Sequence, residues 1–190
     1  MQTPILENER VKLTLLDLNN YHYLKAISQE KDLICYSPSN ISTADKLSEY
    51  VKVAVNGYKN KTTLPFIVYD KEKQAYAGTT RFGLMNWNNK VLHIGWTWIG
   101  RNFQSTGLNA NMKFLMLRYA FEILNFEKVE FRIDERNLKS RKAVEKLGAT
   151  LEGILRKDTI MANGFRRSTC CYGILKEEWQ NIKTTIFKAF

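Results

Sequence analysis

The chain has 190 residues, of which 44% are hydrophobic and 25% charged, and this length and composition suit one globular domain spanning residues 1–190. The net charge of +10 attracts phosphates, nucleic acid and acidic proteins, but it does not separate an enzyme with a nucleotide cofactor from an RNA-binding protein. Three cysteines exclude a disulfide framework, and two histidines offer no metal-site spacing, so we expect no metal. No apolar run has the length of a membrane span, and the N-terminus lacks the pattern of a secretory leader. A cytoplasmic protein, not bound to a membrane, is therefore the default expectation.

Hydrophobic periodicity divides the chain into strands and helices. Residues 10–16 alternate polar and apolar side chains, which predicts a strand, and Thr43 is a candidate N-cap for a helix that runs to about residue 57. The other elements are expected, in chain order, as a helix at 18–29 capped by Asp17; strands at 64–69, 75–84 and 91–99; a helix at 106–125; a strand at 128–133; a helix at 137–147; strands at 151–161 and 166–175 joined by a two-residue turn at Asn163-Gly164; and a short helix from residue 177. The strand–helix–strand crossover in the middle predicts one parallel pair inside an otherwise antiparallel sheet.

The segment from Gln104 to Asn109 joins a predicted strand to a predicted helix. The first turn of a helix leaves backbone N–H groups without partners, and the helix dipole favours an anion there. Gly107 lets the chain approach a phosphate without a Cβ in the way, and Gln104 can add a side-chain donor. The alternative is an ordinary strand-to-helix loop capped by Ser105 or Thr106.

Four motifs in the right order resemble the GNAT N-acetyltransferases. Gln104-x-x-Gly107-x-Asn109 resembles the family signature Q/R-x-x-G-x-G/A, although Asn109 stands where the family has Gly or Ala. The other three are the strand Ile94–Ile99, the block from Asn137 and Ser140 to Gly148, and a C-terminal hairpin, Glu152–Arg156 with Asn163–Thr169, similar to that of the ribosomal-protein alanine acetyltransferase (RimJ/RimL-like) branch. The resemblance covers nearly the whole chain and is weakest from about residue 32 to residue 60.

The resemblance implies an α+β GNAT fold: a mixed, mostly antiparallel sheet of six to seven strands, with a splayed parallel pair and helices on both faces. It also implies acetyl-CoA as co-substrate. The pantetheine arm would pair with main-chain groups of Trp98 and Ile99, and Asn137 would bond to it from the far side. The pyrophosphate would be held by the loop residues Gln104, Ser105, Thr106, Gly107, Leu108 and Asn109.

Two residues are candidates for the chemistry. An amine must be neutral to attack a thioester, so a base or a water relay has to take its proton. Many family members place a glutamate where this chain has His93, which makes His93 a candidate base, since an ordinary histidine titrates near pH 6.5; a packed or surface histidine is the alternative. Ser140 matches the serine that lies by the thioester in the resembling branch, but it also suits the first turn of a helix, and the two roles are compatible. Glu152 and Asp158 are further candidate bases.

The expected function is therefore transfer of an acetyl group from acetyl-CoA to a primary amine by direct attack in a ternary complex. The acceptor is expected to be a protein or peptide N-terminal α-amine or a small-molecule amine. The alternative is a non-catalytic module of the same shape that senses acyl-CoA, or that docks on RNA or the ribosome through its basic surface. The sequence leaves open whether the protein is a monomer or a homodimer.

Overall fold

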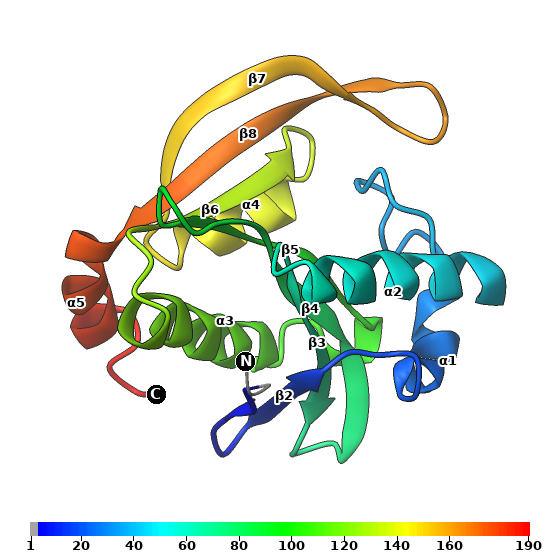
Figure 1. Ribbon diagram of the computed structural model, residues 1–190, viewed down its shortest axis with the longest axis horizontal. Coiled ribbons are helices and arrows are strands. Elements are labelled where there is room, and N and C mark those ends of the chain that lie inside the picture. Colours follow the sequence, from blue (N-terminus) through cyan, green and yellow to red (C-terminus); the bar gives the residue numbers. More distant parts are fainter. Residues whose placement is uncertain (1–3) are drawn as a thin grey trace.

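The computed structural model describes residues 4–190. Met1–Thr3 lie outside the described residues, so the first three residues of the predicted 1–190 domain and of the N-terminal stretch without a leader pattern are not covered. Eight strands form one sheet in the order β1-β2-β3-β4-β5-β6-β8-β7 (Figure 1). The strands are β1 (Leu6–Glu7), β2 (Val11–Leu15), β3 (Leu64–Asp70), β4 (Ala75–Asn86), β5 (Val91–Ile99), β6 (Lys128–Asp134), β7 (Thr150–Ile160) and β8 (Arg166–Leu175).

The helices pack on both faces of this sheet. They are the 3₁₀ turn η1 (Tyr21–Leu24), α1 (Lys25–Ser28), α2 (Ala44–Lys59), the 3₁₀ turn η2 (Arg101–Phe103), α3 (Leu108–Arg118), the π-helical turn η3 (Tyr119–Ile123), α4 (Leu138–Glu145) and α5 (Lys176–Thr185). Among residues 4–190 no helix is long and apolar enough to cross a bilayer.

The strand β3 shows why the sheet has helices on both faces. Its residues are apolar on successive positions, as expected of a strand that is buried on both sides. Phe66 and Val68 belong to the larger hydrophobic cluster, which also holds apolar side chains of α3, α4 and α5, whereas Ile67 points to the opposite face and packs in a second cluster with Leu47 and Val51 of α2. Because successive side chains of a strand alternate between faces, α2 covers one side of the central strands and α3 the other.

Neighbouring strands of the sheet are antiparallel except at one place. The strands β5 and β6 are parallel, and they are connected by a crossover through α3 and η3. The predicted fold is thus confirmed: a mixed, mostly antiparallel sheet with one parallel pair. The number of strands is eight and not six or seven, because the two-residue strand β1 also pairs, through Leu6 with Leu13 and Glu7 with Lys12.

Two local predictions were wrong. The helix expected at 18–29 is only a 3₁₀ turn followed by the four-residue α1, because Asp17 accepts hydrogen bonds from the N–H groups of Asn19 and Asn20 and so forms a tight turn. The hairpin between β7 and β8 has a five-residue loop from Met161 to Phe165 and not a two-residue turn at Asn163-Gly164. Met161 and Phe165 are hydrogen-bonded across the loop base. The cap at Thr43 is confirmed, since its hydroxyl accepts from the N–H of Lys46 at 3.3 Å.

Close contact between β4 and β5 depends on Gly78. A Cβ built on Gly78 would lie 2.0 Å from the carbonyl oxygen of Trp98, far inside van der Waals contact with a backbone atom. A side chain here would therefore push β5 away from β4.

We predict that Gly78→Ala lowers the free energy of unfolding by about 1–3 kcal/mol, because the clash is with backbone that cannot move without breaking strand pairs. Gly153→Ala on β7 is the matched control, since nothing lies within 4 Å of its added Cβ, and it should change stability by less than about 0.5 kcal/mol. Urea denaturation of both variants measures this, and equal midpoints would contradict the prediction.

Candidate active site

The parallel strands β5 and β6 separate soon after they meet. Only three pairs join them, Val91 with Lys128, Leu92 with Val129, and His93 with Glu130. Both strands continue beyond that point, β5 to Ile99 and β6 to Asp134. The main-chain groups that face each other across the gap therefore lack strand partners from residue 94 and from residue 131 onward.

A distortion of β4 and β5 accompanies the separation. The register of β4 on β5 shifts between Thr79 and Arg81, and Trp96 on β5 has φ of 48°, a left-handed conformation that is costly for a bulky residue. A bulge of this kind bends the strand that carries it. We attribute the divergence of β5 from β6 to this bend.

Helix α3 follows β5 after the 3₁₀ turn η2 and a short loop. Gly107 is its N-cap with φ of 82°, and no side chain caps the helix. Nothing lies within 4 Å of a Cβ built on Gly107, so the space in front of the first turn is open. Free amides of the first turn, the helix dipole and this open space fit a phosphate or pyrophosphate group.

Basic and polar side chains fix the loop in front of α3. Gln104 donates from Nε2 to the carbonyl oxygen of Ile99 at 2.8 Å and accepts at Oε1 from Nζ of Lys139 on α4 at 2.6 Å. Arg10 donates to the hydroxyl of Thr106 at 3.3 Å. The side chain of Gln104 thus ties the loop to β5 and to α4, and two cations lie beside the helix terminus.

The predicted cofactor residues come together in this part of the structure. The contact between Gln104 and Lys139 joins the loop to the first turn of α4, which contains Asn137 and Ser140. Three groups of predicted residues therefore border one region: Trp98 and Ile99 at the end of β5; Gln104, Ser105, Thr106, Gly107, Leu108 and Asn109 around the start of α3; and Asn137 with Ser140 at the start of α4.

Asn137 is the N-cap of α4, and its Oδ1 accepts from the N–H of Ser140 at 3.1 Å. Both residues are half-buried. The amide group of Asn137 is planar, so this bond also fixes where its NH₂ group points. Asn137 can therefore cap the helix and still donate a hydrogen bond to another molecule.

His93 lies at the last paired position of β5, where the strands begin to separate. Its side chain is 6% exposed, packs edge-on against Trp96 with 5.4 Å between ring centroids, and leaves Nδ1 without a partner among the described residues. Burial, helped by the charges of Arg132, Lys113 and Arg167, lowers the pKa of His93 to about 3. The imidazole is therefore neutral at the pH values at which enzymes commonly work.

The further acid–base candidates are engaged elsewhere. Glu152 forms an ion pair with Lys128 at 2.8 Å, and Asp158 accepts from the hydroxyl of Thr169 at 2.7 Å. Cys170 is buried on β8, and burial raises the pKa of its thiol, so it is a poor nucleophile. Among residues 4–190, no group of three or more His, Cys, Asp and Glu side chains is arranged to hold a metal ion.

Lys113 on α3 is a buried lysine that the sequence analysis did not single out. Its side chain is 5% exposed, and Nζ donates to the hydroxyls of Thr97 at 2.8 Å and Thr80 at 3.3 Å. None of its contacts in residues 4–190 is an ion pair with a carboxylate, and burial lowers the pKa of Lys113 to about 7. A lysine in a helix usually indicates a solvated face, so the burial of Lys113 could be found only from the fold.

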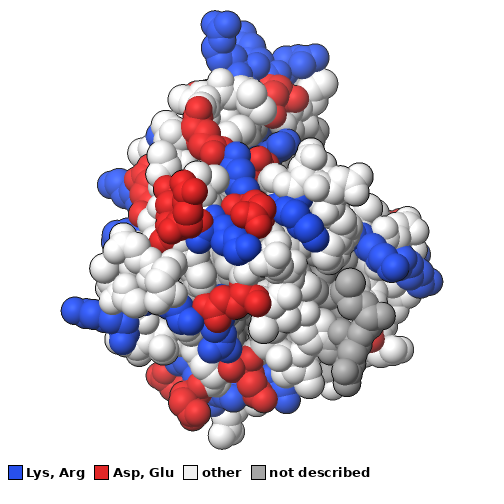
Figure 2. All heavy atoms as spheres, turned by 60° about the vertical axis from the view of Figure 1, so that its left-hand side comes forward, with Lys and Arg blue, Asp and Glu red and all other residues white. Residues whose placement is uncertain are grey.

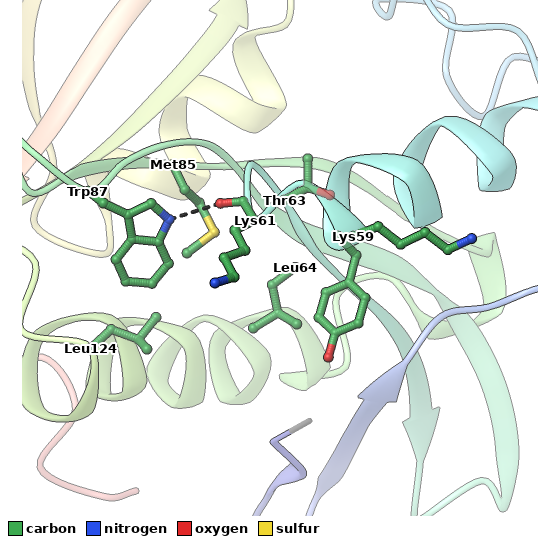
Figure 3. A pocket seen from close by; sticks show the side chains of 8 residues that line it. Lys59, Lys61, Thr63, Leu64, Met85, Trp87 and Leu124 are labelled. Carbon is green, nitrogen blue, oxygen red and sulfur yellow. Dashed lines mark hydrogen bonds between the residues drawn. The ribbon is translucent and has the colours of Figure 1, made fainter. Parts of the chain in front are cut away.

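A separate hollow lies at the other end of the α3–η3 helix. It is lined by residues that include Lys61, Met85, Trp87 and Leu124, has a volume of about 260 Å³, and contains a hydrogen bond of 2.9 Å from Nε1 of Trp87 to the carbonyl of Lys61 (Figure 3). None of the buried side-chain polar atoms that lack a partner in residues 4–190 belongs to its lining. We therefore do not connect it with the unpaired strands.

Comparison with known proteins agrees with the geometry. Residues 10–150 match the family model described as Acetyltransferase (GNAT) domain. The chain belongs to the GNAT acetyltransferase family. This confirms the family predicted from the motifs, and with it an acetyl-CoA-dependent N-acetyltransferase.

Individual relatives of this GNAT protein are distant. It is 33% identical over 95 residues to a protein of Bacillus subtilis (strain 168) described as "Putative ribosomal N-acetyltransferase YdaF", which covers 50% of this chain and 51% of that protein, so the match spans about half of either. A crystal structure of a putative acetyltransferase from T. thermophilus is 26% identical, with a TM-score of 0.87 over 98% of this chain and 96% of that one. The microcin C7 self-immunity acetyltransferase MccE, solved with acetyl-CoA and AMP, shares the fold at 22% identity and a TM-score of 0.79, over 88% of this chain and 93% of that one.

The buried Lys113 makes stability depend on pH. Its pKa is about 7 in the folded protein and close to the ordinary 10.5 in the unfolded chain. Between these values the unfolded chain holds a proton that the folded protein lacks, so stability rises with pH by up to about 1.4 kcal/mol per unit.

We predict that Lys113→Met removes this rise, because methionine fills similar space without a charge. The variant should be more stable than the wild type at pH 7, by on the order of 2–4 kcal/mol, and the difference should shrink towards pH 9. Urea denaturation at pH 6, 7, 8 and 9 measures it, with Lys142→Met on the exposed side of α4 as control. A constant difference between Lys113→Met and the wild type would contradict the prediction.

Proposed function

We propose that the pyrophosphate of acetyl-CoA binds at the start of α3 and that its pantetheine arm lies between β5 and β6. The uncapped helix N-terminus with open space at Gly107 supports the first part. The end of β5 at Trp98 and Ile99 is paired with β4 but has no strand partner on the β6 side, and this supports the second part. The carbonyl of Ile99 already accepts from Gln104, so it has one lone pair left to offer. Asn137 donates to the arm from the side of α4.

The acceptor is a primary amine, and a protein or peptide N-terminal α-amine or a small-molecule amine fits the proposal. The amine reaches the gap from the side of α2, opposite α3, and attacks while both substrates are bound. Acetyl-CoA supplies the activated acyl group as a thioester. Free N–H groups of β5 beyond His93 face the gap and can stabilise the oxyanion that forms.

Ser140 and His93 are the residues that we propose beside the reacting groups, Ser140 for proton transfer and His93 for positioning. Ser140 lies half-buried in the first turn of α4 and would donate to the leaving sulfur. His93 is neutral, and with a pKa of about 3 it accepts a proton only transiently, so its share in the reaction is to position the amine or a water molecule through Nδ1.

The likeness to YdaF favours a ribosomal-protein acceptor and a RimJ/RimL-like protein of the cytoplasm. Docking on RNA or the ribosome through charge, the competing proposal, would need a continuous basic surface. On the face drawn in Figure 2, basic side chains are interspersed with acidic ones. The face drawn therefore offers no continuous basic patch for electrostatic docking.

We predict that acetyl-CoA at a hundredfold excess over its Kd raises the melting temperature by roughly 5–10 °C, and that Gly107→Glu abolishes the rise by placing a carboxylate where the phosphates bind. Gly164→Glu is the control: Gly164 has φ of 81° and equally open space, but it lies in the β7–β8 hairpin loop. Thermal unfolding with and without ligand measures this. An equal rise in both variants would remove the helix N-terminus from the binding site.

We predict that His93→Ala lowers kcat at least tenfold while acetyl-CoA still raises the melting temperature, and that exposed His22→Ala changes neither. Because the pKa of His93 is about 3, the imidazole does not titrate near pH 6.5. The pH profiles of kcat/KM for the wild type and for His93→Ala should therefore have the same shape around that pH. Steady-state release of CoA thiol between pH 6 and 9 is the measurement. A rate within about twofold of the wild type over that range would remove His93 from the mechanism.

A further inference from the structure

A groove of about 340 Å³ opens on the α2 side of the sheet, next to the stretch of β5 that has no strand partner on the β6 side. Its lining includes Asn40 from the segment before α2, Tyr50 of α2, Arg81 of β4 and Trp96 of β5. It is separate from the start of α3, which lies beyond the end of β5. The groove is therefore on the side from which we propose that the acceptor arrives.

Arg81 is the buried charge of this groove. The residue is 2% exposed, and its guanidinium carbon lies 4.5 Å from the ring centroid of Tyr50 and 5.0 Å from that of Trp96. Nε and Nη2 have no hydrogen-bond partner in residues 4–190, and the ion pairs of this part of the chain do not include Arg81. A buried charge without a counter-charge is costly, so its retention calls for a bound partner.

Ring contacts link Arg81 to two other residues that have unsatisfied polar atoms. Six buried side-chain polar atoms lack a partner in the described residues, and five of them belong to Arg81, His93, Trp98 and Arg167. Ring contacts connect three of these residues through Trp96 and Tyr50: His93 to Trp96 at 5.4 Å, and Tyr50 to Trp98 at 6.3 Å. The nitrogens of the arginines and of Trp98 can only donate, and the Tyr50 hydroxyl is a neutral acceptor beside Arg81 and Trp98, so no anionic acceptor meets these donors.

The acidic side chains of the groove do not supply that acceptor. Asp45 and Glu49 lie on the exposed surface of α2, and Glu49 already pairs with Lys52 at 2.8 Å. Charges at the rim are screened by solvent, whereas a guanidinium between two aromatic rings acts in a medium of low dielectric constant. The field inside the groove is therefore that of Arg81.

We propose that Arg81 binds an anionic group of the acceptor, a carboxylate or a phosphate, so that the enzyme acts on amines that also carry such a group. This rests on the proposed acetyl transfer and narrows its substrate class. The guanidinium stacks on the rings of Tyr50 and Trp96, and its Nε and Nη2, which have no partner in the described residues, are N–H donors of the fork that matches a carboxylate or phosphate. Because Trp96 belongs to the stretch of β5 that has no β6 partner, an acceptor anchored beside it directs its amine to that strand.

Matched acceptors test the proposal. Glycyl dipeptides with a free C-terminal carboxylate are compared with their carboxamides, and phosphoethanolamine with ethanolamine, in the wild type, Arg81→Met, Arg81→Lys and the control Arg118→Met. Arg118 also stacks on an aromatic ring, Phe114, but it is exposed on α3. Release of CoA thiol gives kcat/KM for each pair, and the two pairs distinguish a carboxylate from a phosphate.

We expect at least one anionic acceptor to exceed its neutral partner tenfold or more in kcat/KM in the wild type and in Arg118→Met. This ratio should fall below about threefold in Arg81→Met and lie between these values in Arg81→Lys, which keeps the charge but loses the fork. Equal rates for both members of each pair in the wild type, or a ratio that persists in Arg81→Met, would overturn the proposal.

Binding of inorganic phosphate, followed by tryptophan fluorescence, separates this proposal from the acetyl transfer on which it rests. Quenching that saturates in the wild type and in Arg118→Met, is weaker in Arg81→Lys and is lost in Arg81→Met supports the anion site, even if no acetyl-CoA binding is found. Should Arg81→Met fail to fold, Arg81→Lys and the wild-type acceptor pairs still decide the question. If acetyl-CoA raises the melting temperature of every variant but the wild type shows no preference for anionic acceptors, the anion site at Arg81 is rejected and the proposed acetyl-CoA binding stands.

Discussion

The separation of β5 from β6 after His93 and Glu130 is the constraint on which the rest of the structure depends. Inner strands of a sheet normally pair on both sides, whereas β5 and β6 have no strand partner on the sides that face each other beyond this point. The left-handed Trp96 and the register shift opposite it bend β5, while Gly78 keeps β5 tightly bound to β4 on its other side. The cost of the unpaired groups is compensated when another molecule bonds to them, as a strand-like cofactor arm does.

The two faces of the sheet beside this gap each carry a buried cation without a carboxylate partner. Lys113 lies on the α3 face, bonded to the hydroxyls of Thr80 and Thr97, and Arg81 lies on the α2 face between two aromatic rings. They respond to burial differently. The lysine lowers its pKa to about 7 and can lose its charge, whereas a guanidinium stays charged and has to find an anion. This difference is why we connect Arg81, and not Lys113, with a substrate.

Much of the fold could be predicted because local signals agreed with the tertiary structure. The apolar run at 64–69, the cap at Thr43 and the change from strand to helix period near Gly107 all correspond to observed elements. The predictions that were wrong depend on turn geometry: Asp17 caps a tight turn, and the β7–β8 loop closes with five residues.

The site was only partly predictable. The family motifs identified the loop and the start of α4, which the contact between Gln104 and Lys139 joins. The burial that makes Lys113 and Arg81 unusual arises from residues distant in sequence, and the same burial gives His93 a pKa of about 3 where an ordinary histidine would titrate near 6.5.

Backbone hydrogen exchange with and without acetyl-CoA tests the central claim most directly, because the claim concerns main-chain groups that no substitution can remove. The account predicts that the ligand slows exchange of amides at residues 94–99 of β5 and 107–110 at the start of α3, while amides of β2 and β3 are unchanged. Unchanged exchange in both of these segments at saturating ligand, or protection confined to the hollow beside Trp87, would contradict it.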